Sequence, residues 1–249
     1  AAGGESPAGG SSFVTLTETW NGTNWTEASD LSEGKRYIGM AGASNTSVLV
    51  FGGQLNPGAS VNTESWNGTS WTEVSNLNAA KFFGGSSGTQ TSALFYGGAP
   101  GPVTASNELW NGTNWTEVND LSRPSGQMDA SEFGTTTAAL YFGGYTGSNL
   151  DLSEEYNGTS WAEGDNYPTI ARDLTGCGTQ TAALGMGGYM PSPAFGLDIY
   201  DQGREEAMNQ GMNETDVLVY HGSTDAPIVD VAETGVGAGT IVDDIVYGG

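Results

Sequence analysis

A repeat of 44 to 46 residues narrows the possible folds of this chain more than any other feature. Its first mark is a pair of glycines, and its second is an aromatic residue 12 or 13 positions after that pair. A fixed period of this size is typical of solenoids and propellers, in which each unit buries its apolar face only against its neighbours. The glycine pairs are Gly52-Gly53, Gly97-Gly98, Gly143-Gly144 and Gly187-Gly188, and the aromatic positions are Trp20, Trp66, Trp110, Tyr156 and Tyr200.

Each repeat predicts two pairs of antiparallel strands. The first half is a short apolar run that ends at the glycine pair, as in residues 46–51, and such a run suits a strand buried on both faces. Residues 37–42 are the expected partner strand, and the two glycines allow a sharp turn and a close approach of neighbouring backbones. The second half reads Trp-Asn-Gly-Thr-x-Trp, and Asn-Gly between strand-forming residues predicts a hairpin whose two turn residues both have positive φ. The repeat is therefore predicted to be a four-stranded unit.

The repeated aromatic residues are expected to pack between these units, because large aromatic side chains supply much of the buried area. Their fixed register favours packing over the alternative, which is stacking on sugars. The second aromatic of each hairpin is expected in the core, and a leucine at a fixed offset is expected to fill the space between units. These second aromatics are Trp25, Trp71, Trp115 and Trp161, and the leucines are Leu31, Leu77 and Leu121.

Composition divides the chain into four segments. Residues 1–12 are rich in Gly, Ser, Ala and Pro and predict a flexible lead, and the repeats occupy residues 13–201. Residues 202–215 are polar and predict a linker, and residues 216–249 are strand-like again and predict a partial β domain. No run of 18 apolar residues predicts a membrane helix, and the first residues have neither the basic nor the apolar region of a signal peptide.

The order of strand, Gly-Gly, aromatic and Trp resembles the kelch repeat over residues 13–201, and the Trp-Asn-Gly-Thr-x-Trp form is most similar to kelch-like repeats of bacterial secreted proteins and marine phage structural proteins. The resemblance implies an all-β, kelch-like β-propeller of four-stranded blades, here with four to five repeats, closed by strands from the two chain ends. Here the N-terminal hairpin and four inner strand pairs would close a four-bladed ring, whereas rings of the family more often have five to seven blades. Residues 221–231 and 243–248 resemble part of a bacterial extracellular β domain of unknown function, which implies a surface or secreted location.

The charge of the chain restricts its partners. There are 29 Asp and Glu against 6 Lys and Arg, a net charge of −23. Such a chain repels nucleic acid and anionic membrane surfaces, so neither nucleic-acid binding nor membrane insertion is expected. Calcium is a weak possibility, since four carboxylates lie in the last segment without a recognised loop pattern, and no other cofactor is expected. These carboxylates are Asp225, Asp230, Asp243 and Asp244.

The chain has few residues of the types that act as catalytic nucleophiles or bases. The single cysteine, Cys177, permits no intramolecular disulfide and is expected to be a buried, inert thiol. The single histidine, His221, lies outside the repeats, so no nucleophile–base pair is visible and the chain is not expected to be an enzyme.

Binding is expected instead at the loops that follow the glycine pairs, because these differ between repeats while the strands do not. They are residues 54–62, 99–106, 145–150 and 189–195, and the candidate binding residues are Gln54, Asn56, Tyr145, Asn149 and Tyr189. The sequence thus predicts a non-enzymatic recognition or adhesion protein, extracellular or on a cell or virion surface, that binds glycan or protein. The alternative is a structural subunit of a filament, phage tail, fibre or surface layer, assembled by strand pairing between chains, because open strand edges template pairing. Either a homo-oligomer or a filament is then possible.

Overall fold

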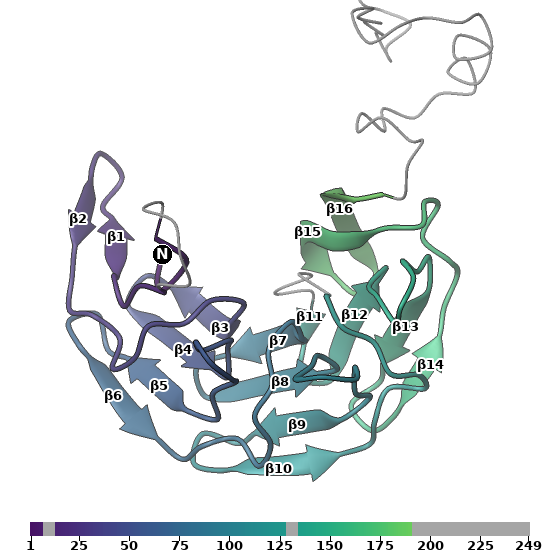
Figure 1. The fold of residues 1–249 in the computed structure, drawn as a ribbon, viewed down its shortest axis with the longest axis horizontal. Coiled ribbons are helices and arrows are strands. Elements are labelled where there is room, and N and C mark those ends of the chain that lie inside the picture. The colour runs from purple at the N-terminus through teal and green to yellow at the C-terminus, as the bar shows by residue number, and fades with distance from the viewer. Residues whose placement is uncertain (7–12, 128–133, 191–249) are drawn as a thin grey trace, which may run out of the picture. The chain divides into compact units, whose positions relative to one another are not determined.

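The computed structural model describes residues 1–6, 13–127 and 134–190, which all belong to one compact unit, Ala1–Phe195. The described residues form strands β1 to β16 and no helix, so the predicted all-β class is confirmed (Figure 1). The predicted linker at 202–215, the partial β domain at 216–249, Tyr200 and His221 lie outside the described residues.

Three four-stranded antiparallel sheets form the main body of the described chain, and we name each sheet a blade. In every blade two inner strands are followed along the chain by the hairpin that supplies the two outer strands, as predicted. Blade 1 consists of β3 (Gly39–Ser44), β4 (Ser47–Phe51), β5 (Thr63–Trp66) and β6 (Trp71–Val74). Blade 2 consists of β7 (Gly85–Thr89), β8 (Ser92–Tyr96), β9 (Asn107–Trp110) and β10 (Trp115–Val118). Blade 3 consists of β11 (Gly134–Thr135), β12 (Ala138–Phe142), β13 (Ser153–Tyr156) and β14 (Trp161–Glu163).

Two further hairpins flank the blades in the sequence. The first pairs β1 (Glu18–Trp20) with β2 (Trp25–Glu27) and corresponds to the outer half of a blade. The second pairs β15 (Arg172–Thr179) with β16 (Ala182–Tyr189) and corresponds to an inner half. Each is a separate two-stranded sheet, and no pairing between β1 and β16 joins them in the described part of the chain. The ring closure expected from the resemblance is therefore not formed among these residues.

Successive sheets pack through their innermost strands, β3 against β7, β7 against β11 and β11 against β15 (Figure 1). The glycine pairs make this approach possible. Gly52 and Gly53 have φ of 62° and 109°, a region that L side chains rarely adopt. A Cβ on Gly52 would lie 2.5 Å from the Lys81 carbonyl oxygen, and the Gly53 N–H donates to that same oxygen at 3.0 Å. All four pairs have positive φ, so the predicted sharp turn and close backbone approach are confirmed.

The hairpin turns differ from the prediction. In the blade 1 hairpin, the Asn67 N–H donates to the Ser70 carbonyl oxygen at 3.3 Å, so Gly68 and Thr69 are the central residues. Of the Asn-Gly pair, only Gly68 has positive φ, at 92°. Asn67 instead accepts hydrogen bonds at its Oδ1 from the N–H groups of Thr69 and Ser70, both at 2.9 Å. The prediction of two positive-φ residues is wrong because Asn stabilises the turn through its side chain from the position before it.

The aromatic residues form the core between blades. Trp66, Trp110 and Tyr156 are buried, as are Trp115 and Trp161 from the second aromatic position, while Trp71 is half-buried. The Trp115 Nε1–H of blade 2 donates to Thr63 Oγ1 of blade 1 at 2.9 Å, which shows that the indole bridges two blades. The leucines at the fixed offset are buried too, as predicted.

The first hairpin breaks the rule at both aromatic positions. Trp20 is 43% exposed, so its predicted packing between units is wrong. Trp25 is 59% exposed, so its predicted core role is wrong. Its hairpin, β1–β2, has no inner strands paired to it in the described chain, and no blade precedes it there to cover the indole.

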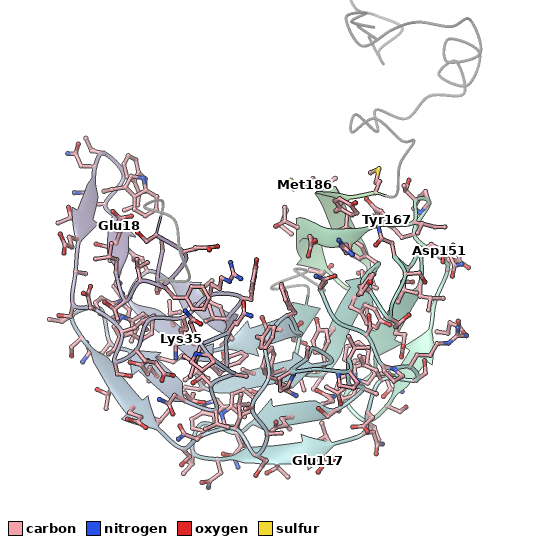
Figure 2. All side chains as sticks on the ribbon, viewed as in Figure 1. Glu18, Lys35, Glu117, Asp151, Tyr167 and Met186 are labelled. Carbon is pink, nitrogen blue, oxygen red and sulfur yellow. The ribbon has the colours of Figure 1, made fainter. Side chains whose placement is uncertain are left out.

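The last hairpin is open for the same reason. Cys177 on β15 is exposed, so the predicted buried thiol is wrong. On β16 the side chains of Leu184 and Met186, the latter labelled in Figure 2, are exposed, whereas the equivalent strands β4, β8 and β12 are largely buried. No outer hairpin covers β16 among the described residues.

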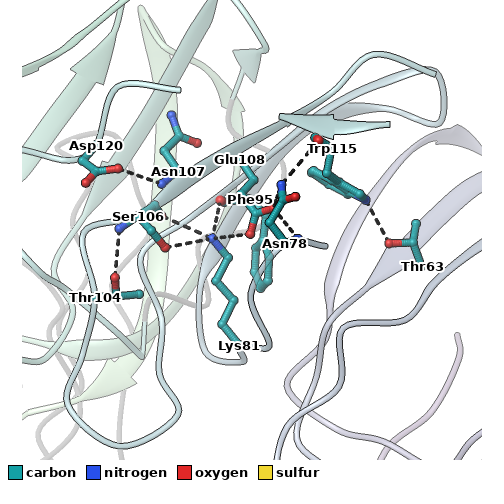
Figure 3. Close-up of polar contacts among 10 residues, drawn as sticks. All are labelled: Thr63, Asn78, Lys81, Phe95, Thr104, Ser106, Asn107, Glu108, Trp115 and Asp120. Atoms are coloured by element: carbon teal, nitrogen blue, oxygen red, sulfur yellow. Dashed lines mark hydrogen bonds and ion pairs between the residues drawn. The ribbon is translucent and has the colours of Figure 1, made fainter. Parts of the chain in front are cut away.

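Buried charges hold the segment that enters each of the first two blades against that blade, an arrangement that the sequence pattern did not predict. In blade 2 the carboxylate of Glu108 accepts hydrogen bonds from the backbone N–H and the side-chain amide of Asn78, both at 2.8 Å (Figure 3). Lys81 Nζ lies 3.6 Å from Glu108 Oε1 and donates to the carbonyl oxygens of Phe95 and Ser106 at 3.0 and 3.3 Å. Burial lowers the pKa of Lys81 to about 8, and the Glu108 carboxylate opposes this shift.

The same glutamate position recurs in the other blades with different partners. Lys35 pairs with Glu64 at 3.2 Å in blade 1, and in blade 3 Tyr141 donates its hydroxyl proton to Glu154 at 3.1 Å. On the outermost strand of each blade, by contrast, the glutamate is exposed, and Glu117 of β10 points to solvent (Figure 2). Among the described residues, both lysines are therefore buried beside glutamates, whereas the outermost strands carry exposed glutamates.

Candidate functional site

Four non-glycine residues with left-handed backbone recur at the repeat spacing. Tyr37, Phe83, Gln127 and Asp173 have φ of 52°, 61°, 52° and 55° and lie where the innermost strands begin. This conformation lets the backbone of one repeat reach that of the one before, since the Asp173 N–H donates to the Gln127 carbonyl oxygen at 3.0 Å. A left-handed non-glycine residue costs on the order of 1–3 kcal/mol, and such residues gather at sites where the surrounding structure holds them.

The residue before each left-handed position pairs with the first residue after a glycine pair. Arg36 pairs in this way with Gln54, Gly126 with Tyr145, and Arg172 with Tyr189. Three of the five predicted binding residues thus lie at one equivalent position of successive repeats, next to the left-handed residues. The repeat symmetry explains this placement, because the loops all leave the sheets at the same edge.

Two of these positions come together around one arginine. The Arg172 Cζ lies 4.7 Å from the ring centroid of Tyr145 and 4.4 Å from that of Tyr189, so both rings face the guanidinium. Asn149 Nδ2 donates to the Tyr189 carbonyl oxygen at 2.8 Å and bridges the loop of blade 3 to β16. Arg172 Nε lies 3.4 Å from Asp173 Oδ2. We name these five residues the Arg172 cluster.

The polar groups of the Arg172 cluster are not used up inside the protein. The guanidinium is held by its ion pair with Asp173, and its Nε is buried without a close hydrogen bond. The side chains of Arg172 and Asp173 are 24% and 36% exposed, and Tyr189 is 55% exposed. Desolvation raises the pKa of Asp173, and the adjacent Arg172 charge opposes that rise. The cluster therefore offers an aromatic surface, free donors and a carboxylate at one place.

The equivalent arginine of the first repeat is arranged differently. Arg36 lies over the rings of Phe13 and Tyr37, at 4.7 and 4.6 Å from Cζ to the centroids. Its Nε donates to Gln54 Oε1 at 2.8 Å, and its Nη1 pairs with Glu5. Its donors are thus engaged within the chain, which makes Arg36 a matched internal control for Arg172.

The sequence reasoning selected part of this site. Tyr145, Asn149 and Tyr189 are brought together in the Arg172 cluster, whereas Gln54 pairs with Arg36 and Asn56 lies exposed in the loop of blade 1. Arg172 was missed, although its position in the repeat matches that of Arg36 in a chain with only 6 Lys and Arg. An arginine at the same repeat position twice, in a chain with so few cations, was the sequence signal that could have identified Arg172.

No group of three or more His, Cys, Asp or Glu suited to a metal ion occurs among residues 1–6, 13–127 and 134–190. The same described part has no helix long and apolar enough to cross a membrane. The weak calcium candidates of the last segment lie outside it. A scan against models of protein families finds no match, and no curated protein is significantly similar to the chain.

Proposed function

We propose that this chain is a non-enzymatic recognition protein that binds a glycan or protein at a cell or virion surface. It would bind through the loops that follow the glycine pairs. The observation that carries the proposal is the partly exposed Arg172 guanidinium, which lies over two tyrosine rings from different repeats and beside the partly exposed Asp173 carboxylate. Exposed polar and aromatic groups held by a rigid β scaffold are typical of binding surfaces. The repeated tryptophans of the three complete blades are engaged in packing, which leaves the loops to bind.

The test is surface binding by the full chain. Labelled protein is applied to a glycan array and to bacterial cells, and a double variant, Tyr145→Ala with Tyr189→Ala, is compared with Trp25→Ala. We expect binding that the double variant loses and Trp25→Ala keeps, because Trp25 is an exposed aromatic on another element. Bound glycans are expected to be recovered with unchanged mass. The proposal would be overturned if the labelled protein bound neither the cells nor the array. It would also be overturned if only Trp25→Ala lost binding.

A second candidate function is the structural subunit of an assembly, built from kelch-like propeller blades. Its support is the way the first hairpin is held. Asn45 Nδ2 donates to the Trp20 carbonyl oxygen at 3.1 Å, as Gln180 Nε2 does to that of Tyr156 at 2.9 Å. The Trp71 Nε1–H also donates to Thr17 Oγ1 at 2.9 Å, in the manner of Trp115 and its partner on blade 1. The hairpin β1–β2 thus has the contacts of the outer half of a blade, and no inner half is paired with it in the part of the chain that the structure describes.

The hairpin β15–β16 is the complementary half. In blade 1, Val48 pairs with Trp66 and Leu49 with Ser65 across the junction of inner and outer halves. The same register applied to the open edges would place Leu184 of β16 opposite Thr19 of β1. Such edges pair readily with any strand that completes the sheet, whether it comes from the same chain or a second one.

Cysteine cross-linking tests this candidate. Thr19→Cys and Leu184→Cys are each made with Cys177→Ser, and the two single-cysteine chains are mixed and oxidised. A disulfide-linked dimer of the two variants, together with ladders from a chain that carries both, would support assembly between chains. A cross-link confined to the monomer would instead mean closure within one chain and would remove this candidate, as would the absence of any cross-link.

A further inference from the structure

We propose that the Arg172 cluster binds an uncharged sugar residue through two neighbouring hydroxyl groups, with the sugar ring against Tyr189. This inference rests on the proposed recognition function and names the ligand class for it. It follows from three properties of the cluster, which are its donor–acceptor pair, its exposed ring and its local charge.

The donor–acceptor pair suits a diol. A sugar hydroxyl both donates one hydrogen bond and accepts others, so neighbouring hydroxyls are best met by a donor beside an acceptor. Arg172 supplies N–H donors only, and the carboxylate of Asp173 supplies acceptors only. The two groups lie 3.4 Å apart at their nearest atoms, and both side chains are partly exposed.

The guanidinium is also held in a fixed plane. The rings of Tyr145 and Tyr189 face it at 4.7 and 4.4 Å, and Arg172 and Tyr189 are direct partners on β15 and β16. Asn149 ties the loop of blade 3 to the same strand. Because Nε is buried and two rings lie against the guanidinium, the terminal N–H groups are the donors that remain for a ligand. A rigid donor loses less conformational entropy on binding.

Tyr189 supplies the apolar part of the surface. Its side chain is 55% exposed, because no outer hairpin covers β16 among the described residues. An exposed aromatic ring is apolar on its face and polar at its hydroxyl, a combination suited to a ligand that has apolar and polar surfaces. The C–H face of a sugar ring is such a surface.

Charge favours an uncharged ligand over an acidic one. The Asp173 carboxylate beside Arg172 already balances the guanidinium charge, and it would repel a second carboxylate placed there. The chain as a whole carries a net charge of −23, which opposes the approach of anions. A basic protein segment would be attracted by this charge, but it could not use the free donors of Arg172.

The test uses the full chain and defined probes. Neutral oligosaccharides of glucose, mannose and galactose, and an oligosaccharide of galacturonic acid, are titrated by calorimetry. Wild type is compared with Arg172→Lys, Asp173→Asn and Tyr189→Ala, and Arg36→Lys is the matched control. Asn tolerates the left-handed backbone at residue 173, so that variant keeps the fold. Circular dichroism and thermal melts check folding of every variant.

We expect at least one neutral sugar to bind, and each of the three cluster variants to weaken it tenfold or more, while Arg36→Lys changes binding less than twofold. Tighter binding of the galacturonic acid probe than of every neutral sugar would overturn the inference. Sugar binding that the cluster variants leave unchanged would also overturn the inference. The recognition function would then stand, with its binding site at another surface. If no sugar binds but cells still bind, the sugar assignment fails alone; if nothing binds, the recognition function fails with it.

Discussion

The buried lysine of blade 2 predicts a measurable pH dependence of stability. Lys81 is almost fully buried, and burial lowers its pKa from 10.5 to about 8 despite the Glu108 carboxylate (Figure 3). In the unfolded chain the lysine keeps its ordinary pKa. Between the two values the unfolded state holds one more proton than the folded state. The free energy of unfolding therefore gains a contribution that rises with pH across this window.

The size of this contribution follows from the shift. One pKa unit corresponds to about 1.4 kcal/mol, so the lowered pKa is equivalent to about 3 kcal/mol in total. Below pH 8 the folded protein carries this penalty in full, because the lysine is charged in both states. It is relieved as the pH rises from 8 towards 10.5, the range given by the two pKa values.

Urea unfolding of wild type and Lys81→Met from pH 7 to pH 10.5 measures the effect. Methionine is similar in length and does not titrate, so the wild-type value minus the variant value isolates the lysine. We expect this difference to rise by about 3 kcal/mol over the range, regardless of its value at pH 7. Burial raises the pKa of Tyr96 to about 12, but this tyrosine is present in both proteins and cancels.

The control removes a cation that is exposed. Arg123 lies 3.0 Å from Glu163, and both side chains are about half exposed, so the same comparison with Arg123→Met should be flat in pH. A flat difference for Lys81→Met as well would refute the argument, since it would mean that the lysine titrates alike in both states. A difference that falls with pH would show that the Glu108 pair outweighs burial.

The other predictions concern residues whose burial or close contacts decide the effect of a substitution or a reagent. Trp115→Ala should lower the free energy of unfolding in urea by about 3–5 kcal/mol, because it empties a packed core site, while Trp25→Ala should change it by no more than about 0.5 kcal/mol. Equal losses would contradict the burial difference. Gly52→Ala should lower the melting temperature clearly more than Gly22→Ala, since a Cβ at residue 52 meets backbone at 2.5 Å and one at residue 22 meets nothing within 4 Å. Cys177 should react with a thiol reagent in the native protein at a rate close to that in denaturant, and a thiol that reacts only after unfolding would refute its exposure.

The repeat made much of the fold predictable because each blade reuses the same local rules. Glycine pairs that turn sharply, an Asn-Gly hairpin and a buried aromatic such as Trp110 are visible as single letters at a fixed spacing. The failures lie where no neighbouring unit is formed by residues 1–6, 13–127 and 134–190. Trp25 and Cys177 follow the repeat pattern in sequence, but burial depends on what covers a side chain, and a periodic pattern contains no information about the units beside it.

The candidate site was only partly predictable for a different reason. Tyr145 and Tyr189 were selected because they begin variable loops, but their meeting across Arg172 requires two successive repeats to be placed in space. The left-handed residues were also hidden, since Tyr37 and Asp173 share a backbone conformation and no side-chain chemistry. Backbone geometry of this kind repeats in the structure without repeating in the sequence.

Residues at equivalent positions of the repeats differ in this chain, and their partners indicate whether each difference serves packing or function. At the buried glutamate position the partner changes from Lys35 to Lys81 to Tyr141, yet in each copy a cation or a hydroxyl group lies beside the same carboxylate, so packing explains that variation. At the position before the left-handed residue, Arg36 donates from two nitrogens to Gln54 and Glu5, whereas Arg172 Nε is buried without a close hydrogen bond. Residues that depart from a repeat without a compensating partner are where function is expected. By that criterion the Arg172 cluster is the first surface of this protein to test.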